Sequence, residues 1–323
     1  MIKLTALLKE VLSEGGNVFG TTSPIKKEDI EPTITHFKKE LARLFPKKAK
    51  SFNTLHPLGS AGKKPVSGDI DLGYDVQNFF TGNKKPDLEG WGLSQKDYNT
   101  RLALVQKRAR TASESQLQLR TMIDLIGDKI NNTSDVIRVD LKQSAAGSIF
   151  CETGQYNNKG EELGKTVQTD INIGNLDWLK FSYYSSTYEG NLKGLHRTQL
   201  LVALFANKKY MFKHNQGVLD SNTREVVATS PKQVTDLLNK LYNIKLTPDT
   251  LENYNSLMKY LKEHVDESDL NDVLDKYLKI LDSTRVDIPV DLQKYWIQNQ
   301  DRLGLKGKFL PDDSTLTKYK KEA

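Results

Sequence analysis

Leu58-Gly-Ser-Ala-Gly-Lys-Lys-Pro-Val-Ser-Gly-Asp-Ile-Asp-Leu-Gly-Tyr74 is the stretch of sequence that decides the fold. Near its end, Asp69 and Asp71 alternate with Ile70 and Leu72. Alternate residues of a β-strand point to the same face. We therefore expect a strand that turns its two aspartates toward one spot and its apolar residues toward a core.

The two aspartates predict a metal site. Carboxylates that are pushed together repel each other, and buried carboxylates resist ionising. A divalent cation compensates for both effects, and hard oxygen ligands suit Mg²⁺ or Mn²⁺. Just upstream, Gly59-Ser60 predicts a turn whose N–H groups and hydroxyl suit a phosphate. Together these groups are those that an enzyme uses for metal-assisted phosphoryl or nucleotidyl transfer.

Two lysines, Lys63 and Lys64, lie between the predicted phosphate turn and the predicted metal strand. They could neutralise a triphosphate, or they could simply cap an exposed loop. Their position between the two elements favours the first interpretation.

The pattern Gly59-Ser60 followed by Asp69-Ile70-Asp71-Leu72 resembles the signature of the DNA polymerase beta-like nucleotidyltransferase superfamily. The resemblance covers the catalytic core alone. It implies a helix, a strand, the Gly-Ser turn and a second strand carrying Asp-x-Asp, with a third carboxylate on a later strand. Residues 59–71 also resemble nucleotidyltransferase-like proteins of large tailed phages.

Length and composition limit the possible classes of protein. The 323 residues suffice for one large or two ordinary domains. No apolar run approaches the roughly 20 residues that span a bilayer, and residues 1–19 lack a signal-peptide core. The single cysteine, Cys151, excludes an internal disulfide framework. We therefore expect no membrane partner and a cytoplasmic location, in the host cytoplasm if the gene is phage-encoded.

The formal net charge of +6 favours anionic partners such as an NTP or a nucleic acid. The 47 basic residues face 41 acidic ones, however, and a well-solvated surface has much the same balance. Both interpretations stay open at this point.

Hydrophobic periodicity and turn residues predict the order of elements. We expect a mixed α/β fold, with a central sheet flanked by helices and a helical C-terminal region. A catalytic domain over 1–230 would contain a helical insertion at about 77–134, and 231–323 would form a helical, possible acceptor-binding domain. The expected elements are helices at 2–13 and 26–45, a first core strand at 51–58, a loop at 77–94, helical structure at 94–131 with a break near 111–113, and strands at 135–141, 148–156 and 165–173.

The third carboxylate is assigned to Asp170. In residues 166–173, Gln168, Asp170 and Asn172 share one face of the predicted strand, opposite an apolar face. An acid on the polar face of a central strand suits a two-metal site, where it also helps deprotonate the attacking hydroxyl. Asp140, on the strand one hairpin earlier, is the alternative, and either aspartate could be an ordinary solvated residue.

Farther along the chain, a predicted helix at about 192–206 begins with Lys193, His196 and Arg197. Positive charge at a helix N-terminus is locally unfavourable, which favours a ligand for Arg197 over a solvated helix start. We interpret His196 as a surface histidine, because it has no partner at zinc-ligand spacing.

The sequence therefore predicts a metal-dependent nucleotidyltransferase. Asp69, Asp71 and Asp170 would hold two Mg²⁺ ions, with Mn²⁺ as an alternative, and the nucleotide would be bound by Gly59, Ser60, Lys63, Lys64 and Arg197. The expected reaction moves an NMP from an NTP, ATP first, to the 3′ end of RNA, tRNA or another nucleic acid, releasing pyrophosphate. Nucleotide transfer to a protein or small molecule is one alternative, and a non-catalytic protein that binds nucleic acid or an assembly on this scaffold is the other.

Overall fold

The computed structural model describes residues 18–59, 61–63, 65–82, 84–110, 112–144, 147–184, 194–284 and 286–305. The chain divides into two compact units. The sheet unit comprises Gly15–Thr187 and His214–Gln216, and the helical unit includes Tyr188–Lys213 and the chain from Gly217 onward. The division near residue 187 comes well before the boundary expected at 230, so the segment 188–213 groups with the C-terminal helices. The helix expected at 2–13 lies outside the described residues.

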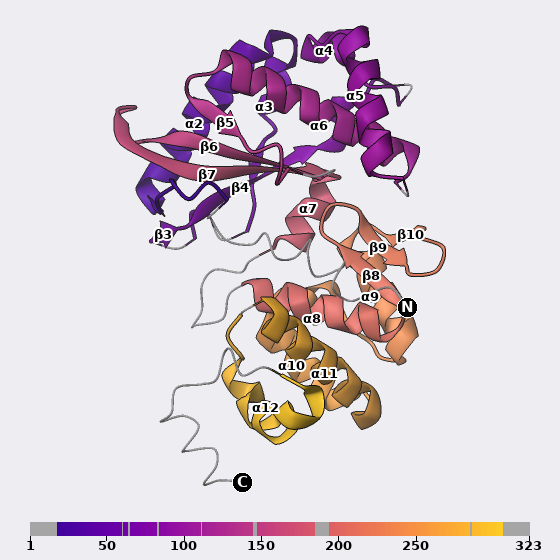
Figure 1. The fold of residues 1–323 in the computed structure, drawn as a ribbon. Helices are drawn as coiled ribbons and strands as arrows, with labels where there is room; N and C mark the ends of the chain where they lie inside the picture. The colour runs from indigo at the N-terminus through magenta and orange to yellow at the C-terminus, as the bar shows by residue number, and fades with distance from the viewer. Residues whose placement is uncertain are drawn as a thin grey trace. The chain divides into compact units, whose positions relative to one another are not determined.

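The sheet unit is built on a five-stranded mixed sheet of order β2-β4-β7-β6-β5 (Figure 1). The β4 and β7 strands are parallel, and the other neighbouring pairs are antiparallel. This arrangement confirms the predicted mixed α/β fold. The strands are β2 (His56–Pro57), β4 (Asp69–Asp75), β5 (Ile137–Val139), β6 (Ser148–Tyr156) and β7 (Glu162–Gly174).

Two long helices lie along one face of this sheet (Figure 1). They are α2 (Lys27–Leu44), which contacts β6, and α6 (Glu114–Thr133), which contacts β5. The apolar stripe of α2 meets the apolar face of the strands in one buried core, and burial of that stripe stabilises the helix. A capping box between Ser113 and Gln116 starts α6, immediately after the predicted break.

The prediction of a strand at 51–58 is wrong for most of these residues. Residues 46–52 continue the helical path of α2 as η1 (Pro46–Lys48) and α3 (Ala49–Phe52), and only β2 is extended. The expected loop also contains helical turns, η2 (Val76–Phe79) and α4 (Leu88–Trp91), before α5 (Gln95–Arg108). The reason is that these short segments contribute aromatic rings to one buried cluster, and the packing of the rings favours helical turns over extended chain. The cluster consists of Phe45, Phe52, Tyr74, Phe79 and Trp91.

Two small elements complete the sheet unit. A short antiparallel pair joins β1 (Ile25–Lys26) to β3 (Val66–Ser67) and ties the start of α2 to the segment before β4. The helix α7 (Leu176–Ser182) follows β7 directly and contacts both β4 and β7. Its N-cap is Asn175, whose side chain accepts a hydrogen bond from the Trp178 N–H.

The helical unit packs α8 (Gly194–Asn207) against α11 (Glu267–Thr284). A three-stranded antiparallel sheet follows α8, with strands β8 (Tyr210–Lys213), β9 (Gly217–Asp220) and β10 (Val226–Ala228). The remaining elements are α9 (Pro231–Tyr242), η3 (Pro248–Leu251), α10 (Tyr254–His264) and α12 (Val290–Leu303). Among the described residues, no helix combines the length and apolar character needed to cross a membrane.

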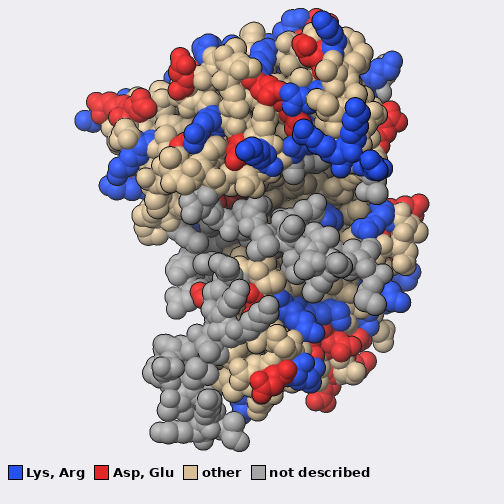
Figure 2. All heavy atoms as spheres, viewed as in Figure 1, with Lys and Arg blue, Asp and Glu red and all other residues tan. Residues whose placement is uncertain are grey.

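On the face shown in Figure 2, Lys and Arg side chains are interspersed with Asp and Glu side chains over both units. The chain carries 47 basic and 41 acidic residues, so such mixing is the expected appearance of a solvated surface. The net charge of +6 therefore gives little reason by itself to name a partner.

Candidate functional site

The candidate site lies on the face of the sheet opposite α2 and α6, where β4 and β7 run side by side. In the parallel register, Asp71 is paired with Asp170, and Asp69 is paired with Gln168. Residues that are paired across neighbouring strands point to the same face, and the strands lie about 4.8 Å apart. The structure therefore brings the three predicted aspartates to one place.

Asp140, the alternative third carboxylate, has a different environment. It follows β5 directly, and its Oδ1 accepts hydrogen bonds from the N–H groups of Lys142 and Gln143 at 2.8 and 3.1 Å. This is the local turn that Asp side chains commonly make with the backbone. Asp140 is thus occupied in shaping the turn after β5 and has no place in the β4–β7 register.

Each carboxylate at the centre of the site is held by an amide side chain of β7. Gln168 Nε2 donates a hydrogen bond to Asp170 Oδ2 at 2.7 Å, and Asn172 Nδ2 donates to Asp71 Oδ1 at 3.0 Å. The second oxygen of Asp170, Oδ1, is buried and has no hydrogen-bond partner among the described residues. A buried carboxylate oxygen without a partner is costly in a folded protein.

The electrostatics of the site raise the pKa of two of these acids, Asp71 and Asp170. Burial, and then the charge of Asp69, raise the pKa of Asp71 to about 7, against the stabilising hydrogen bond from Asn172. Burial and the charge of Asp71 likewise raise the pKa of Asp170 well above its ordinary value. Asp69 and Asp71 remain half-buried, so a ligand can reach them. Each of two carboxylates that face one another disfavours charge on the other, and strongly perturbed carboxylates of this kind mark a candidate functional site.

Glu152, a fourth acid on the same face of the sheet, provides a contrast. Its Oε1 accepts hydrogen bonds from the hydroxyls of Thr21 and Thr166 at 2.8 and 2.7 Å, and its Oε2 pairs with Arg138 on β5. Burial opposes ionisation, but these partners together lower the pKa of Glu152. Glu152 is satisfied within the protein, whereas Asp170 is not.

The donor set fits a hard cation. Three carboxylates, one with an unpartnered buried oxygen, match the oxygen ligands that Mg²⁺ and Mn²⁺ prefer. Within the described ranges, no group of three or more acidic, histidine or cysteine side chains is placed so that it could hold a metal ion. The aspartates therefore share a face and a register without forming a closed cage.

The backbone at Gly59 borders the aspartates. Gly59 has a φ of +61°, and a Cβ placed on it would lie 3.3 Å from Asp71 Oδ2. The N–H of Leu58 donates to the carbonyl of Asp71 at 2.8 Å, which holds this segment against β4. A glycine is favoured here both by the positive φ and by the close approach to the carboxylate.

The other predicted nucleotide contacts are less defined. Ser60 and Lys64 lie outside the described residues. Lys63 places its Nζ 5.3 Å from the centre of the Tyr184 ring, and burial lowers the pKa of its ammonium group. Tyr184 also forms a bridge with Gly59, so Lys63 belongs to the same loop region as the glycine. Its role toward a phosphate stays a prediction.

Two of the three residues predicted at the start of this helix, His196 and Arg197, are buried in the helical unit, and Lys193 lies outside the described residues. Arg197 is 2% exposed, and its Nε donates to the carbonyl of Leu251 at 2.7 Å. A role for Arg197 in nucleotide binding stays a prediction, but its guanidinium already has a structural partner. The interpretation of His196 as a surface residue is wrong, because it is 2% exposed and its Nδ1 lies 2.8 Å from the Tyr277 hydroxyl. The reason is that α8 is buried all round and has no solvated face.

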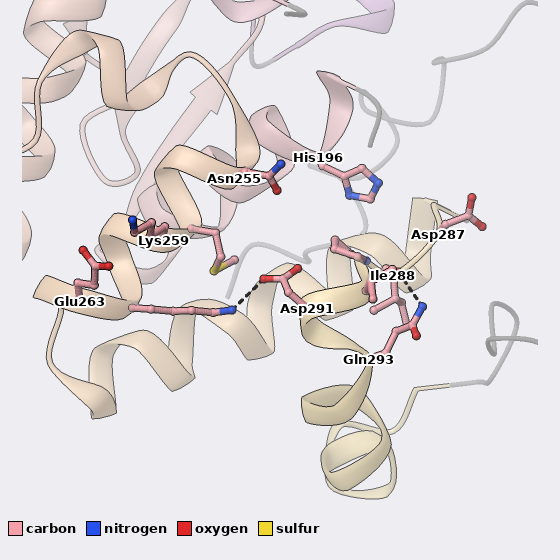
Figure 3. A pocket seen from close by; sticks show the side chains of 12 residues that line it. His196, Asn255, Lys259, Glu263, Asp287, Ile288, Asp291 and Gln293 are labelled. Atoms are coloured by element: carbon pink, nitrogen blue, oxygen red, sulfur yellow. Dashed lines mark hydrogen bonds and ion pairs between the residues drawn. The ribbon is translucent and has the colours of Figure 1, made fainter. Parts of the chain in front are cut away.

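His196 also lines a pocket of about 860 Å³ within the helical unit (Figure 3). The pocket lies between α10 and the segment that leads into α12. Lys262 Nζ pairs with Asp291 Oδ2 at 2.8 Å, and the Tyr254 hydroxyl donates to Asp291 Oδ1 at 3.0 Å. None of the lining residues belongs to the aspartate site.

The amides Gln168 and Asn172 are the site residues to which the sequence assigned no role. Their polar character on the face of Asp170 was visible in the alternation of β7. Their hydrogen bonds to particular carboxylates depend on the register between β4 and β7, which no local pattern contains. Cys151, on the opposite face of β6, has a pKa raised by burial and then by Asp170, so its thiol stays protonated.

No family model matches this sequence, and no curated protein matches it either.

Proposed function

We propose that the protein is a metal-dependent nucleotidyltransferase whose active site is the polar face of β4 and β7. The observation that carries the proposal is the pairing of Asp71 with Asp170, which leaves one buried oxygen of Asp170 without a partner. Asp69 lies two residues before Asp71 on the same face. Three acids so placed, one of them unsatisfied, favour a site completed by a cation.

Asp69, Asp71 and Asp170 would hold two Mg²⁺ or Mn²⁺ ions. When bound, such ions neutralise charge on the transferring phosphoryl group and favour ionisation of the attacking hydroxyl. Asp170 would accept the proton of that hydroxyl in its ionised form. Gly59 lets the backbone approach the carboxylates closely, which leaves room for the β- and γ-phosphates of the nucleotide.

In the proposed reaction, an acceptor hydroxyl attacks the α-phosphorus of an NTP, ATP being the first to test. A new bond forms between the acceptor oxygen and the α-phosphorus, and the bond from that phosphorus to the bridging oxygen breaks. Pyrophosphate leaves with the bonding electrons. The acceptor we propose is a nucleic-acid 3′ end, and the labelling test below compares it with a protein acceptor.

The test is transfer of label from each of the four α-labelled NTPs to total RNA in the presence of Mg²⁺. We expect the parent protein to label RNA and Asp71→Ala to lose the activity. The matched control is Asp75→Ala, which changes the last residue of β4, whose Oδ1 accepts from the Gln77 N–H. Equal labelling by the parent and Asp71→Ala proteins would overturn the proposal. A product that resists nuclease but not protease would replace the nucleic-acid acceptor by a protein.

A further inference from the structure

The two amide side chains that flank Asp170 on β7 are as buried as the apolar core. Gln168 is 0% exposed and Asn172 is 4% exposed. Burying an amide costs free energy unless its donors and acceptors are paired. A valine or leucine at either position would fill the space without that cost, so the amides call for an explanation.

The orientation of each amide is determined by a second partner. The N–H of Val18 donates to Gln168 Oε1 at 3.0 Å. Because a backbone N–H can only donate, that contact identifies the oxygen and leaves the NH₂ group of Gln168 to face Asp170. On the other side, the hydroxyls of Ser148 and Tyr183 both donate to Asn172 Oδ1 at 2.9 Å.

Each amide therefore engages one carboxylate oxygen and leaves the other. Gln168 occupies Oδ2 of Asp170, and the remaining Oδ1 is the buried atom without a hydrogen-bond partner. Asn172 occupies Oδ1 of Asp71, and the remaining Oδ2 is the oxygen beside Gly59.

We propose that Gln168 and Asn172 are positioning residues that present one chosen oxygen of each aspartate to a divalent cation. The inference rests on the proposed metal-dependent function. A carboxylate that rotates freely must be ordered when it binds a metal, and an amide that already restrains one oxygen lowers that cost. Groups that orient ligands in this way often change metal affinity about 10- to 100-fold when they are removed.

Support for the Asn172 amide continues beyond the strands. Tyr183 comes from the end of α7, and its hydroxyl lies 3.4 Å from Oδ1 of Asn215. Asn215 Nδ2 in turn donates to the carbonyl of Gly147 at 2.5 Å. The Tyr183 hydroxyl thus donates to the oxygen of Asn172, and its removal tests how that donor affects the orientation of the amide.

The test measures the affinity of the purified protein for Mn²⁺ alone, by electron paramagnetic resonance. We expect Asn172→Leu and Gln168→Leu each to weaken Mn²⁺ binding about 10-fold. Tyr183→Phe, which keeps the amide and loses one donor to it, should weaken binding about 3-fold. The matched control is Gln155→Leu, because Gln155 is a buried amide of β6 that donates to the backbone carbonyls of Ser23 and Thr166 instead of to an aspartate.

Two results separate the failure of this inference from the failure of the proposed function. If the parent binds Mn²⁺, Asp71→Ala abolishes binding, and the two amide variants bind as the parent does, the positioning role is overturned and the metal site stands. If the parent itself binds no Mn²⁺, both are overturned. A loss in Gln155→Leu equal to that in Asn172→Leu would also overturn the inference, because it would trace the effect to general destabilisation. Near-UV circular dichroism identifies any variant that fails to fold. If the leucine variants are unfolded, the Mn²⁺ affinity of Tyr183→Phe decides whether the amide has a positioning role.

Discussion

The two faces of β7 are equally buried and energetically opposite. Val167, Ile171 and Ile173 on one face are 0–4% exposed, and Gln168, Asp170 and Asn172 on the other are also 0–4% exposed. Burial of the first set stabilises the fold by about 25 cal/mol per Å². Burial of the second set costs free energy wherever a polar atom lacks a partner. The comparison shows that the exposed fraction alone does not distinguish a core from a site; the pairing of polar atoms does.

The strongest test of the polar face is the pair Asp170→Asn and Asp140→Asn. The two changes are chemically identical, but only Asp170 is paired with Asp71. We expect Asp170→Asn to lower the rate of nucleotide transfer by about 10³-fold or more, equivalent to about 4 kcal/mol. Asp140→Asn should leave it unchanged, because an asparagine oxygen still accepts from Lys142 and Gln143. The measurement is the steady-state rate of transfer from an α-labelled NTP. Equal losses of rate in the two variants would show that the pairing with Asp71 does not distinguish Asp170 from Asp140.

The apolar face of the same strand should respond in stability instead. Ile171→Ala leaves a cavity in the core beneath β7 and should lower the free energy of unfolding by about 2–4 kcal/mol. Transfer activity per folded molecule should stay at the parent value. Leu163→Ala is the control on the same strand, because Leu163 is 37% exposed. Urea unfolding measures the first effect; a loss of activity without a loss of stability would contradict the division between the faces.

Asp71→Asn should make the protein more stable, by an amount that grows as the pH rises. The folded pKa of Asp71 is about 7 and its ordinary value is 3.8. Between those values the folded state binds more protons than the unfolded state, so stability falls as the pH rises from about 4 to about 7. Asparagine carries no such charge. We therefore expect a gain of roughly 1–3 kcal/mol at pH 8, because the half-buried carboxylate is partly solvated.

The measurement is thermal unfolding of the parent and Asp71→Asn proteins in EDTA. The two unfolding temperatures should agree near pH 4 and separate as the pH rises. An Asp71→Asn protein that is less stable than the parent at pH 8 would show that the carboxylate is stabilising when ionised. The free-energy cost of burying polar groups on this face would then come from residues other than Asp71. A gain in stability on loss of a functional acid is a familiar trade-off at active sites.

Polar and apolar residues alternate in 69–72 and 166–173. This alternation is a local property of each strand, so it was enough to predict which residues lie on the polar face and which on the apolar face. It was also enough to place Asp170 on the polar face. The parallel register that sets Asp71 against Asp170 was not predictable, since it joins strands far apart in the sequence. The same limit explains the missed roles of Gln168 and Asn172.

The errors have a similar physical origin. A strand is predicted at 51–58, but Phe52 lies in a helical turn and packs against Phe45 and Trp91, and Trp91 is distant in sequence. His196 carries a polar ring, and polarity predicts exposure. Its partner, the Tyr277 hydroxyl, comes from another helix of the helical unit. Local pattern thus determines the faces of elements, and distant contacts determine which polar groups are buried.

The smallest expected effect concerns the backbone beside the polar face. Gly59 and Gly62 both have a positive φ, +61° and +75°, so alanine at either position should cost about 1 kcal/mol of stability. They differ in one respect. A Cβ at Gly59 would lie 3.3 Å from Asp71 Oδ2, whereas a Cβ at Gly62 would meet no atom within 4 Å.

The two alanine variants therefore separate backbone strain from contact with the site. We expect both to unfold at a similarly lowered temperature, and only Gly59→Ala to lose transfer activity, by about 10-fold, equivalent to about 1.4 kcal/mol. The reason is that the methyl group displaces the carboxylate oxygen that Asn172 leaves available. The loss should appear in kcat and in the affinity for Mn²⁺ together. If Gly62→Ala lost as much activity as Gly59→Ala, the flexibility of the loop, and not the space beside Asp71, would be the property that the site requires.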